Sequence, residues 1–154
     1  MGKPAILDSN LLLLDWCCRF NPSLLRSFKR LSRFEPEDVI LLSETLRLFS
    51  SHWTTPHVLT EVSNLANSLP SWIKDTWIVF VSEQIRLIPE SYESSSNLVS
   101  DPVAIRFGLT DSALVKLAST HVILTMDWPL SALLESRNLA VVNFNRLREA
   151  VVSL

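Results

Sequence analysis

The sequence predicts an α/β domain in three layers, with a central parallel sheet of at least four strands between two layers of helices. Short apolar runs typical of buried strands recur along the chain, and stretches with helical periodicity separate them. Strands that alternate with helices favour a parallel sheet covered on both faces. The 154 residues, 47% of them apolar, are enough for one core, so we expect a single domain over residues 1–154.

The first half of the chain is predicted to begin with a strand that helices follow. A short apolar run ends at Asp8, and apolar side chains then recur at three- and four-residue steps. Asn21-Pro22, Glu35-Pro36 and Thr55-Pro56 each predict a helix start, because proline fits the first helical position. We therefore expect a strand, three helices, a brief extended segment and a fourth helix at residues 4–7, 11–20, 22–33, 36–50, 52–55 and 56–67.

The second half is predicted to hold the remaining two strands. Residues 89–100 are rich in serine and glutamate without apolar periodicity, so we interpret them as a loop. Asp101-Pro102 restarts helical structure, Gly108 ends it, and Thr110 is placed to cap the next helix, which carries Asp111 in its first turn. We expect a helix at residues 71–86, before the loop. After Asp111 we expect a strand at 121–125, a helix at 129–136 and a strand at 139–144.

Composition excludes several classes of protein. The net charge of -2 gives no general support for nucleic-acid binding, so any basic surface must be local. Gly2 and Gly108 are the only glycines, and neither G-x-G-x-x-G nor a Walker loop can be formed, which argues against a nucleotide-binding α/β protein. Lys3 precedes only a short apolar run, which is neither a signal peptide nor a membrane span. We expect a soluble cytoplasmic protein without membrane association.

The cysteines and histidines indicate no zinc or disulfide framework. Cys17 and Cys18 are adjacent in an apolar, helix-like stretch, which favours buried thiols in a reducing compartment. The three histidines lack the H-x-x-x-H and H-E-x-x-H spacings of zinc sites. We therefore interpret the histidines as structural.

Four acidic residues are placed to meet at one edge of the predicted sheet. Asp8 and Asp127 each follow a strand-like run, and the carboxyl ends of parallel strands are where functional groups gather. Asp111 lies in the first turn of a helix, and Glu61 lies at the edge of the apolar face of another. Carboxylates that meet repel one another unless a cation neutralises them, and oxygen ligands suit Mg²⁺ or Mn²⁺. That chemistry points to phosphodiester hydrolysis. Separate helix caps and solvated surface acids are the alternative.

The segments around these acids resemble those of the PIN-domain ribonucleases, over residues 5–143. Asp8-Ser9-Asn10 resembles the family's D-[ST]-[NS] opening, and Thr55-Pro56 to Glu61-Val62 resembles its glutamate-bearing helix. Gly108-Leu109-Thr110-Asp111-Ser112-Ala113 resembles its G-L-[ST]-D-A segment, and Leu124-Thr125-Met126-Asp127 resembles its T-x-D strand end. Val141-Val142-Asn143 would then be the terminal strand. The first four of these elements, in the right order, are far more specific than any one of them alone.

The resemblance implies a PIN-like fold and a Mg²⁺- or Mn²⁺-dependent endoribonuclease. Asp8, Glu61, Asp111 and Asp127 would then be catalytic metal ligands, with Asn10 and Thr125 as supporting polar groups. The family includes toxins of toxin-antitoxin pairs, which a bound antitoxin holds inactive. The residues of 20–50 and 91–100 exceed a compact toxin of that kind. The alternative is a catalytically inactive PIN-like module that binds RNA or protein.

Basic and aromatic residues offer candidate contacts to RNA. Arg26, Lys29, Arg30 and Arg33 recur at three- and four-residue steps, which predicts one basic helix face that follows an RNA backbone; a solvated face is the alternative. Lys116 is a further candidate for phosphate contact, and Trp128 for base stacking. Apolar helices such as residues 39–49 are candidates for homodimer or inhibitor contacts.

Overall fold

Four parallel strands form the central sheet of the computed structural model, which describes residues 2–154. The strands are β1 (Ala5–Leu7), β2 (His52–Trp53), β3 (Val122–Thr125) and β4 (Val141–Asn143). Their order is β2-β1-β3-β4, so the chain winds outward from β1 first to one side and then to the other. The switch of direction lies between β1 and β3, which pair in register from Ala5 with Val122 to Leu7 with Leu124. Ligands of open α/β sheets bind outside the carboxyl ends of the strands at such a switch.

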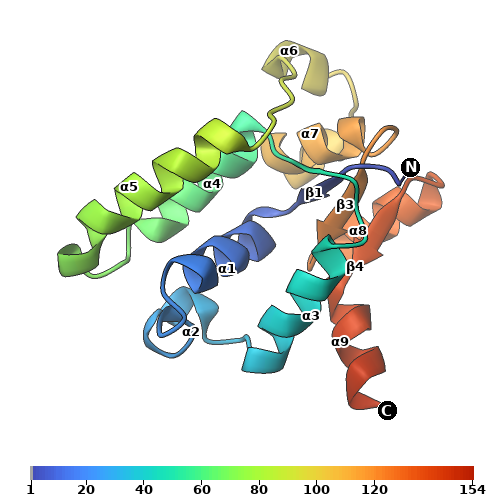
Figure 1. Cartoon of the computed structure of the whole chain (residues 1–154). Helices are drawn as coiled ribbons and strands as arrows, with labels where there is room; N and C mark the ends of the chain where they lie inside the picture. Colours follow the sequence, from blue (N-terminus) through green and yellow to red (C-terminus); the bar gives the residue numbers. More distant parts are fainter. Residues whose placement is uncertain (1) are drawn as a thin grey trace.

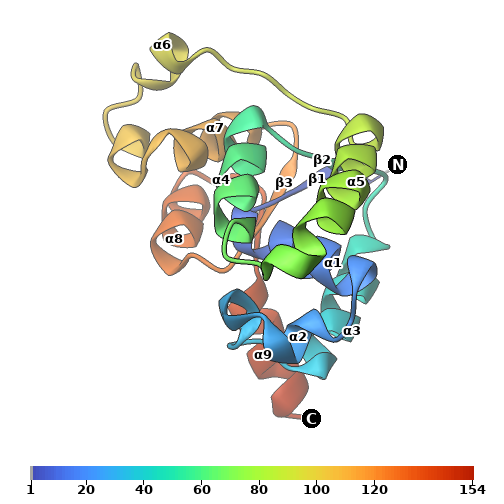
Figure 2. The same ribbon diagram turned by 90° about the vertical axis from the view of Figure 1, so that its left-hand side faces the viewer.

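Helices cover both faces of this sheet, in the predicted three-layer α/β/α arrangement (Figure 1). Those that precede β3 are α1 (Ser9–Phe20), α2 (Leu24–Ser27), α3 (Pro36–Leu46), α4 (Pro56–Ala66), α5 (Ser71–Leu87), α6 (Ser95–Leu98) and α7 (Leu109–Leu117). α8 (Trp128–Ser136) and α9 (Phe144–Val152) follow it. Two 3₁₀ turns, η1 (Lys29–Leu31) and η2 (Ala104–Phe107), complete the list. Turned by 90°, the molecule shows α4 and α5 beside each other and α9 extending away with the C-terminus (Figure 2).

The core lies between the sheet and the helices. All three residues of β1 are buried, and Trp16 and Phe144 are among the largest side chains that are fully enclosed. Cys17 and Cys18 are buried free thiols, as expected, and burial raises the pKa of Cys17 to about 12. The continuous burial of β1 explains why it reads as an unbroken apolar run.

The structure differs from the sequence-based expectation in its helix boundaries. The helix expected over residues 22–33 is instead the short α2 and the η1 turn, because Phe28 between them is extended (φ -95°, ψ 110°) and buried. Gly108, not Thr110, occupies the N-cap of α7, and its φ of 97° suits glycine. Within the segment expected to be a loop, α6 forms and Glu90 bridges to Thr54. The C-terminal helix α9 was not expected.

None of the helices formed by residues 2–154 combines the length and apolar character required to cross a bilayer.

Candidate active site

Asp8 lies at the carboxyl end of β1 and is held by three hydrogen bonds. Its Oδ1 accepts from the backbone N–H of Leu11 at 2.9 Å, which caps α1, as one alternative from the sequence foresaw. Its Oδ2 accepts from the Thr125 hydroxyl and from the backbone N–H of Met126, both at 2.7 Å. Burial raises the pKa of Asp8, although these hydrogen bonds and the charge of Arg33 act in the opposite direction. Thr125 thus supports Asp8 directly.

Glu61 reaches the same edge of the sheet from the middle of α4. Both of its carboxylate oxygens accept hydrogen bonds from hydroxyl groups on other elements: Oε1 from Ser9 at 2.7 Å and Oε2 from Thr110 at 2.6 Å. Sequence reasoning missed these two hydroxyls. Their signal was the serine of the Asp8-Ser9-Asn10 segment and the threonine next to Asp111, which was interpreted as a cap.

Asp127 follows β3 and caps α8. Its Oδ1 accepts from the backbone N–H of Leu130 at 2.8 Å, and its own N–H donates to the Thr125 hydroxyl at 3.0 Å. The Thr125 hydroxyl therefore donates to Asp8 and accepts from the backbone of Asp127. One buried hydroxyl therefore links Asp8, after β1, to Asp127, after β3.

Asp111, in the first turn of α7, has a raised pKa. Its pKa is raised to about 7, first by burial and then by the charges of Asp127, Glu61 and Asp8. Across residues 2–154, no hydrogen bond to its carboxylate offsets that effect. Near neutral pH the group is therefore shared between its protonated and ionised forms.

All four acids line one pocket of about 200 Å³, together with Asn10 and Thr125. The structure thus brings the six residues selected from the sequence to the same hollow. Its remaining wall includes Phe107, Gly108 and Leu109. No lysine, arginine or histidine of the described chain lines the pocket, although the charge of Arg33, outside the lining, lowers the pKa of Asp8.

In donor chemistry and charge the pocket suits a hard dication. Every candidate donor is an oxygen, and the pKa of Asp111 is raised first by burial and then by the neighbouring negative charges, which a cation would offset. As the side chains lie, no three Asp, Glu, His or Cys residues among positions 2–154 are grouped closely enough to hold one ion together. Simultaneous ligation therefore requires a side-chain movement, and the Asp111 carboxylate, to which no hydrogen bond is donated within residues 2–154, is the one free to make it.

The predicted basic helix face is wrong, because its residues do not share one helix. Lys29, Arg30 and Arg33 nevertheless line a second hollow, of about 790 Å³, and Asn10 lines both this hollow and the acidic pocket. Arg26 lies outside both, on α2. We call the second hollow, formed by the three cations with Asn10, Ser27, Ser32 and Ser68, the basic groove.

Lys116 and Trp128 do not line the acidic pocket. Lys116 is exposed near the end of α7. Trp128 is 45% exposed at the start of α8, where the Arg146 guanidinium lies 5.6 Å from its ring centroid. Their predicted RNA contacts find no support in this placement.

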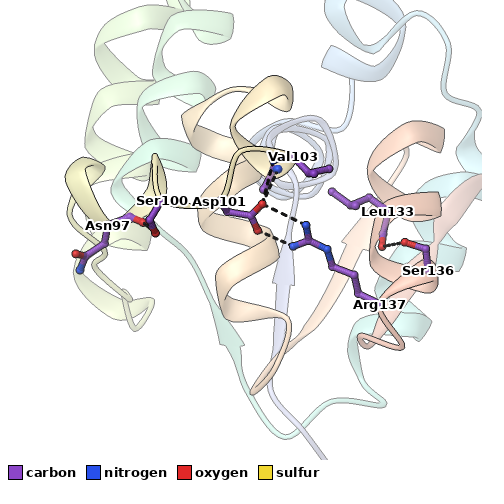
Figure 3. A network of polar contacts seen from close by, with 8 residues as sticks. Asn97, Ser100, Asp101, Val103, Leu133, Ser136 and Arg137 are labelled. Carbon is purple, nitrogen blue, oxygen red and sulfur yellow. Dashed lines mark hydrogen bonds and ion pairs between the residues drawn. The ribbon is translucent and has the colours of Figure 1, made fainter.

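An ion pair secures the chain segment that leads into the pocket wall (Figure 3). Asp101 accepts hydrogen bonds from Arg137 at 2.6 and 3.2 Å, and from the backbone N–H groups of Val103 and Ala104. These contacts tie the start of η2 to the end of α8 and hold the pKa of Asp101 well below its usual range. Because η2 runs directly into Phe107 and Gly108, the pair also restrains one side of the acidic pocket.

Comparison of the chain with models of protein families, with curated proteins and with solved structures found no match.

Proposed function

We propose that this protein is a Mg²⁺- or Mn²⁺-dependent endoribonuclease of the PIN type, which hydrolyses RNA phosphodiester bonds at the acidic pocket. The observation that carries the proposal is that four carboxylates from four separate elements line one pocket, and no basic side chain of the described residues lines it with them. Asp8, Glu61, Asp111 and Asp127 would hold the metal. A dication in such a setting activates water for in-line attack and offsets charge on the leaving oxygen.

The surrounding residues support this role by fixing the carboxylates in place. Thr125 and the Met126 N–H orient Asp8, while Ser9 and Thr110 orient Glu61. Hydrogen bonds from neighbouring groups to ligating carboxylates are a common feature of metal sites. Asn10, between the acidic pocket and the basic groove, is placed to contact RNA that extends from one to the other.

A catalytically inactive module that binds RNA is the second candidate, and the hydrogen bonds made by Asp8 favour it. An ionised carboxylate has about four acceptor positions. Asp8 already uses three of them within the protein, which leaves little capacity for a metal. In this alternative, Asp8 serves only to join β1 to β3.

Cleavage assays with purified protein separate the two candidates. We expect single-stranded RNA to be cleaved in the presence of Mn²⁺ or Mg²⁺ and to remain intact in EDTA. Asp8→Asn and Asp111→Asn should each reduce cleavage by at least 100-fold without loss of the folded state, which circular dichroism checks. Full activity in both variants, or no cleavage with either metal, would contradict the nuclease proposal.

A further inference from the structure

The basic groove and the acidic pocket share a lining residue. Asn10, in the first turn of α1, lines both hollows. On α4, Glu61 lines the pocket and Leu65, one turn further along, lines the groove. A ligand that fills the pocket therefore has a surface to follow into the groove, past Asn10 and along α4.

The cations of the groove are available to an external anion. Within residues 2–154, the side chains of Lys29, Arg30 and Arg33 form no ion pair and no hydrogen bond. By contrast, Arg19, Arg137, Arg146 and Arg148 are all paired with carboxylates. Unpaired positive charge beside a pocket of negative charge matches a chain of phosphates, because the pocket alone repels such a chain.

The groove favours the backbone of a nucleic acid over its bases. Its other polar lining groups are neutral. The hydroxyls of Ser27 and Ser68 donate to backbone carbonyls, which leaves the side chains of Asn10 and Ser32 to donate to phosphate and sugar oxygens. Phe28, the only aromatic residue that lines it, is 3% exposed and offers no face for stacking. Unpaired strands are flexible enough to enter narrow hollows of this kind.

We propose that the basic groove binds the sugar–phosphate backbone of single-stranded RNA beside the bond in the acidic pocket, through Lys29, Arg30 and Arg33 and without base preference. This inference rests on the proposed function, since it names the path of the same substrate. Lys29, Arg30 and Arg33 line one groove although they do not share a helix. Lys29 and Arg30 lie on η1, directly after the buried Phe28, and Arg33 follows that turn.

The test measures binding of a fluorescein-labelled 12-nucleotide oligouridine by anisotropy in EDTA, from 50 to 200 mM KCl. Affinity for single strands falls with salt with a logarithmic slope of about 0.7 per phosphate contact. The triple variant Lys29→Gln/Arg30→Gln/Arg33→Gln should therefore lower that slope by about 2. Lys3→Gln/Arg47→Gln/Arg86→Gln is the matched control, because it removes the same charge from exposed positions outside the groove.

A second variant guards against loss of the fold. Arg33 lies over the Phe34 ring at 5.3 Å, whereas Lys29 and Arg30 make no such contact. Lys29→Gln/Arg30→Gln should lower the salt slope by about 1.4. The control Arg47→Gln/Arg86→Gln should leave the slope nearly unchanged. Oligoadenosine should give the same result as oligouridine.

Three outcomes would overturn the groove proposal. The native protein does not bind RNA, the groove and control variants have equal slopes, or the groove variants lose binding to a glutamate-rich peptide while they still bind RNA. Cleavage is not needed for this readout. A protein that binds RNA through the groove but never cleaves it refutes the nuclease proposal alone, whereas cleavage with an unchanged slope in the triple variant refutes the groove alone.

Discussion

The Ser9 hydroxyl donates a 2.7 Å hydrogen bond to Glu61, a residue 52 positions further along the chain. Thr110 donates to the other oxygen of the same carboxylate from 49 positions away. Glu61 is therefore fixed at both oxygens by residues adjacent to two other acids, Asp8 and Asp111. The geometry of any ion or substrate at this pocket depends on these hydroxyls as well as on the carboxylates.

Removal of these hydroxyls should weaken catalysis more than it weakens the fold. Groups that orient ligating carboxylates typically contribute 10- to 100-fold to metal affinity or activity. We expect Ser9→Ala and Thr110→Ala each to reduce the cleavage rate by about 10-fold and to raise the Mn²⁺ concentration needed for half-maximal activity. Mn²⁺ titration followed by electron paramagnetic resonance provides a measurement that does not depend on turnover.

Thr60→Ala is the matched control for that experiment. Thr60 precedes Glu61 on α4, but its hydroxyl donates to the Pro56 carbonyl and faces away from the pocket lining. Its removal should leave Mn²⁺ affinity unchanged, and Thr110→Ser, which retains a hydroxyl, should restore most of the lost activity. Equal affinities in Ser9→Ala, Thr110→Ala and Thr60→Ala would show that the hydroxyls do not position Glu61.

Asp111 should make the stability of the metal-free protein depend on pH. Its folded-state pKa is about 7, whereas its ordinary value is 3.8. Because the folded pKa is raised, ionisation favours the unfolded state, so stability is full below about pH 4 and is lost as pH rises through 7. Asp111 retains partial solvent contact, and allowing for screening we expect a loss of about 2 kcal/mol.

Urea unfolding in EDTA at pH 5 and pH 8 measures this contribution. Part of the loss has already occurred at pH 5, so Asp111→Asn, whose amide does not ionise, should remove about 1 kcal/mol of the decrease seen between the two pH values. Added Mn²⁺ should stabilise the native protein at pH 8 and have less effect on the variant. A native-to-variant difference that is the same at both pH values would contradict the assigned perturbation of Asp111.

The ion pair between Asp101 and Arg137 should stabilise the pocket wall more than the whole domain. Both side chains are one-third exposed, so solvent screens the pair and its own contribution to the free energy of unfolding is small. Asp101→Ala also removes the acceptor for the N–H groups of Val103 and Ala104. We expect faster hydrogen exchange over residues 103–109, with a small change in the unfolding midpoint.

The control for the wall is Glu135→Ala, which breaks the exposed pair with Arg146 at the far side of α8. That variant should leave hydrogen exchange over residues 103–109 unchanged. If both variants accelerate exchange there equally, the Asp101 pair has no special role in holding the wall.

The sequence predicted the sheet and the acids well because both have local signals. Three of the four strands, β1, β3 and β4, are short apolar runs between helical stretches, and Asp8 and Asp127 follow the first two of these runs. Parallel pairing then brings those ends to one edge, which topology alone dictates. For this reason the four acids, with Asn10 and Thr125, line the pocket they were expected to form.

The contacts that depend on packing were not predictable in the same way. Spacing alone made residues 22–33 a single helix, whereas the burial of Phe28 and Leu31 requires an extended residue between two turns. Thr110 fitted the pattern of a helix cap, but its hydroxyl is used by Glu61 on a different helix. Neither result has a signal in the spacing of neighbouring residues, because each depends on segments that meet only in the folded chain.

The Thr125 hydroxyl contacts residues on both sides of the β1–β3 switch. It is fully buried, donates to Asp8 and accepts from the N–H of Asp127. Thr125→Val keeps the shape of the side chain and leaves both partners short of a bond, so we expect a loss of about 1–3 kcal/mol in the free energy of unfolding. Thr45→Val is the control, because the Thr45 hydroxyl bonds only the Leu41 carbonyl of its own helix. If the two variants unfold at the same urea concentration, the hydroxyl of Thr125 does not link Asp8 to Asp127 in solution, and the alignment of the two strand ends must come from the sheet alone.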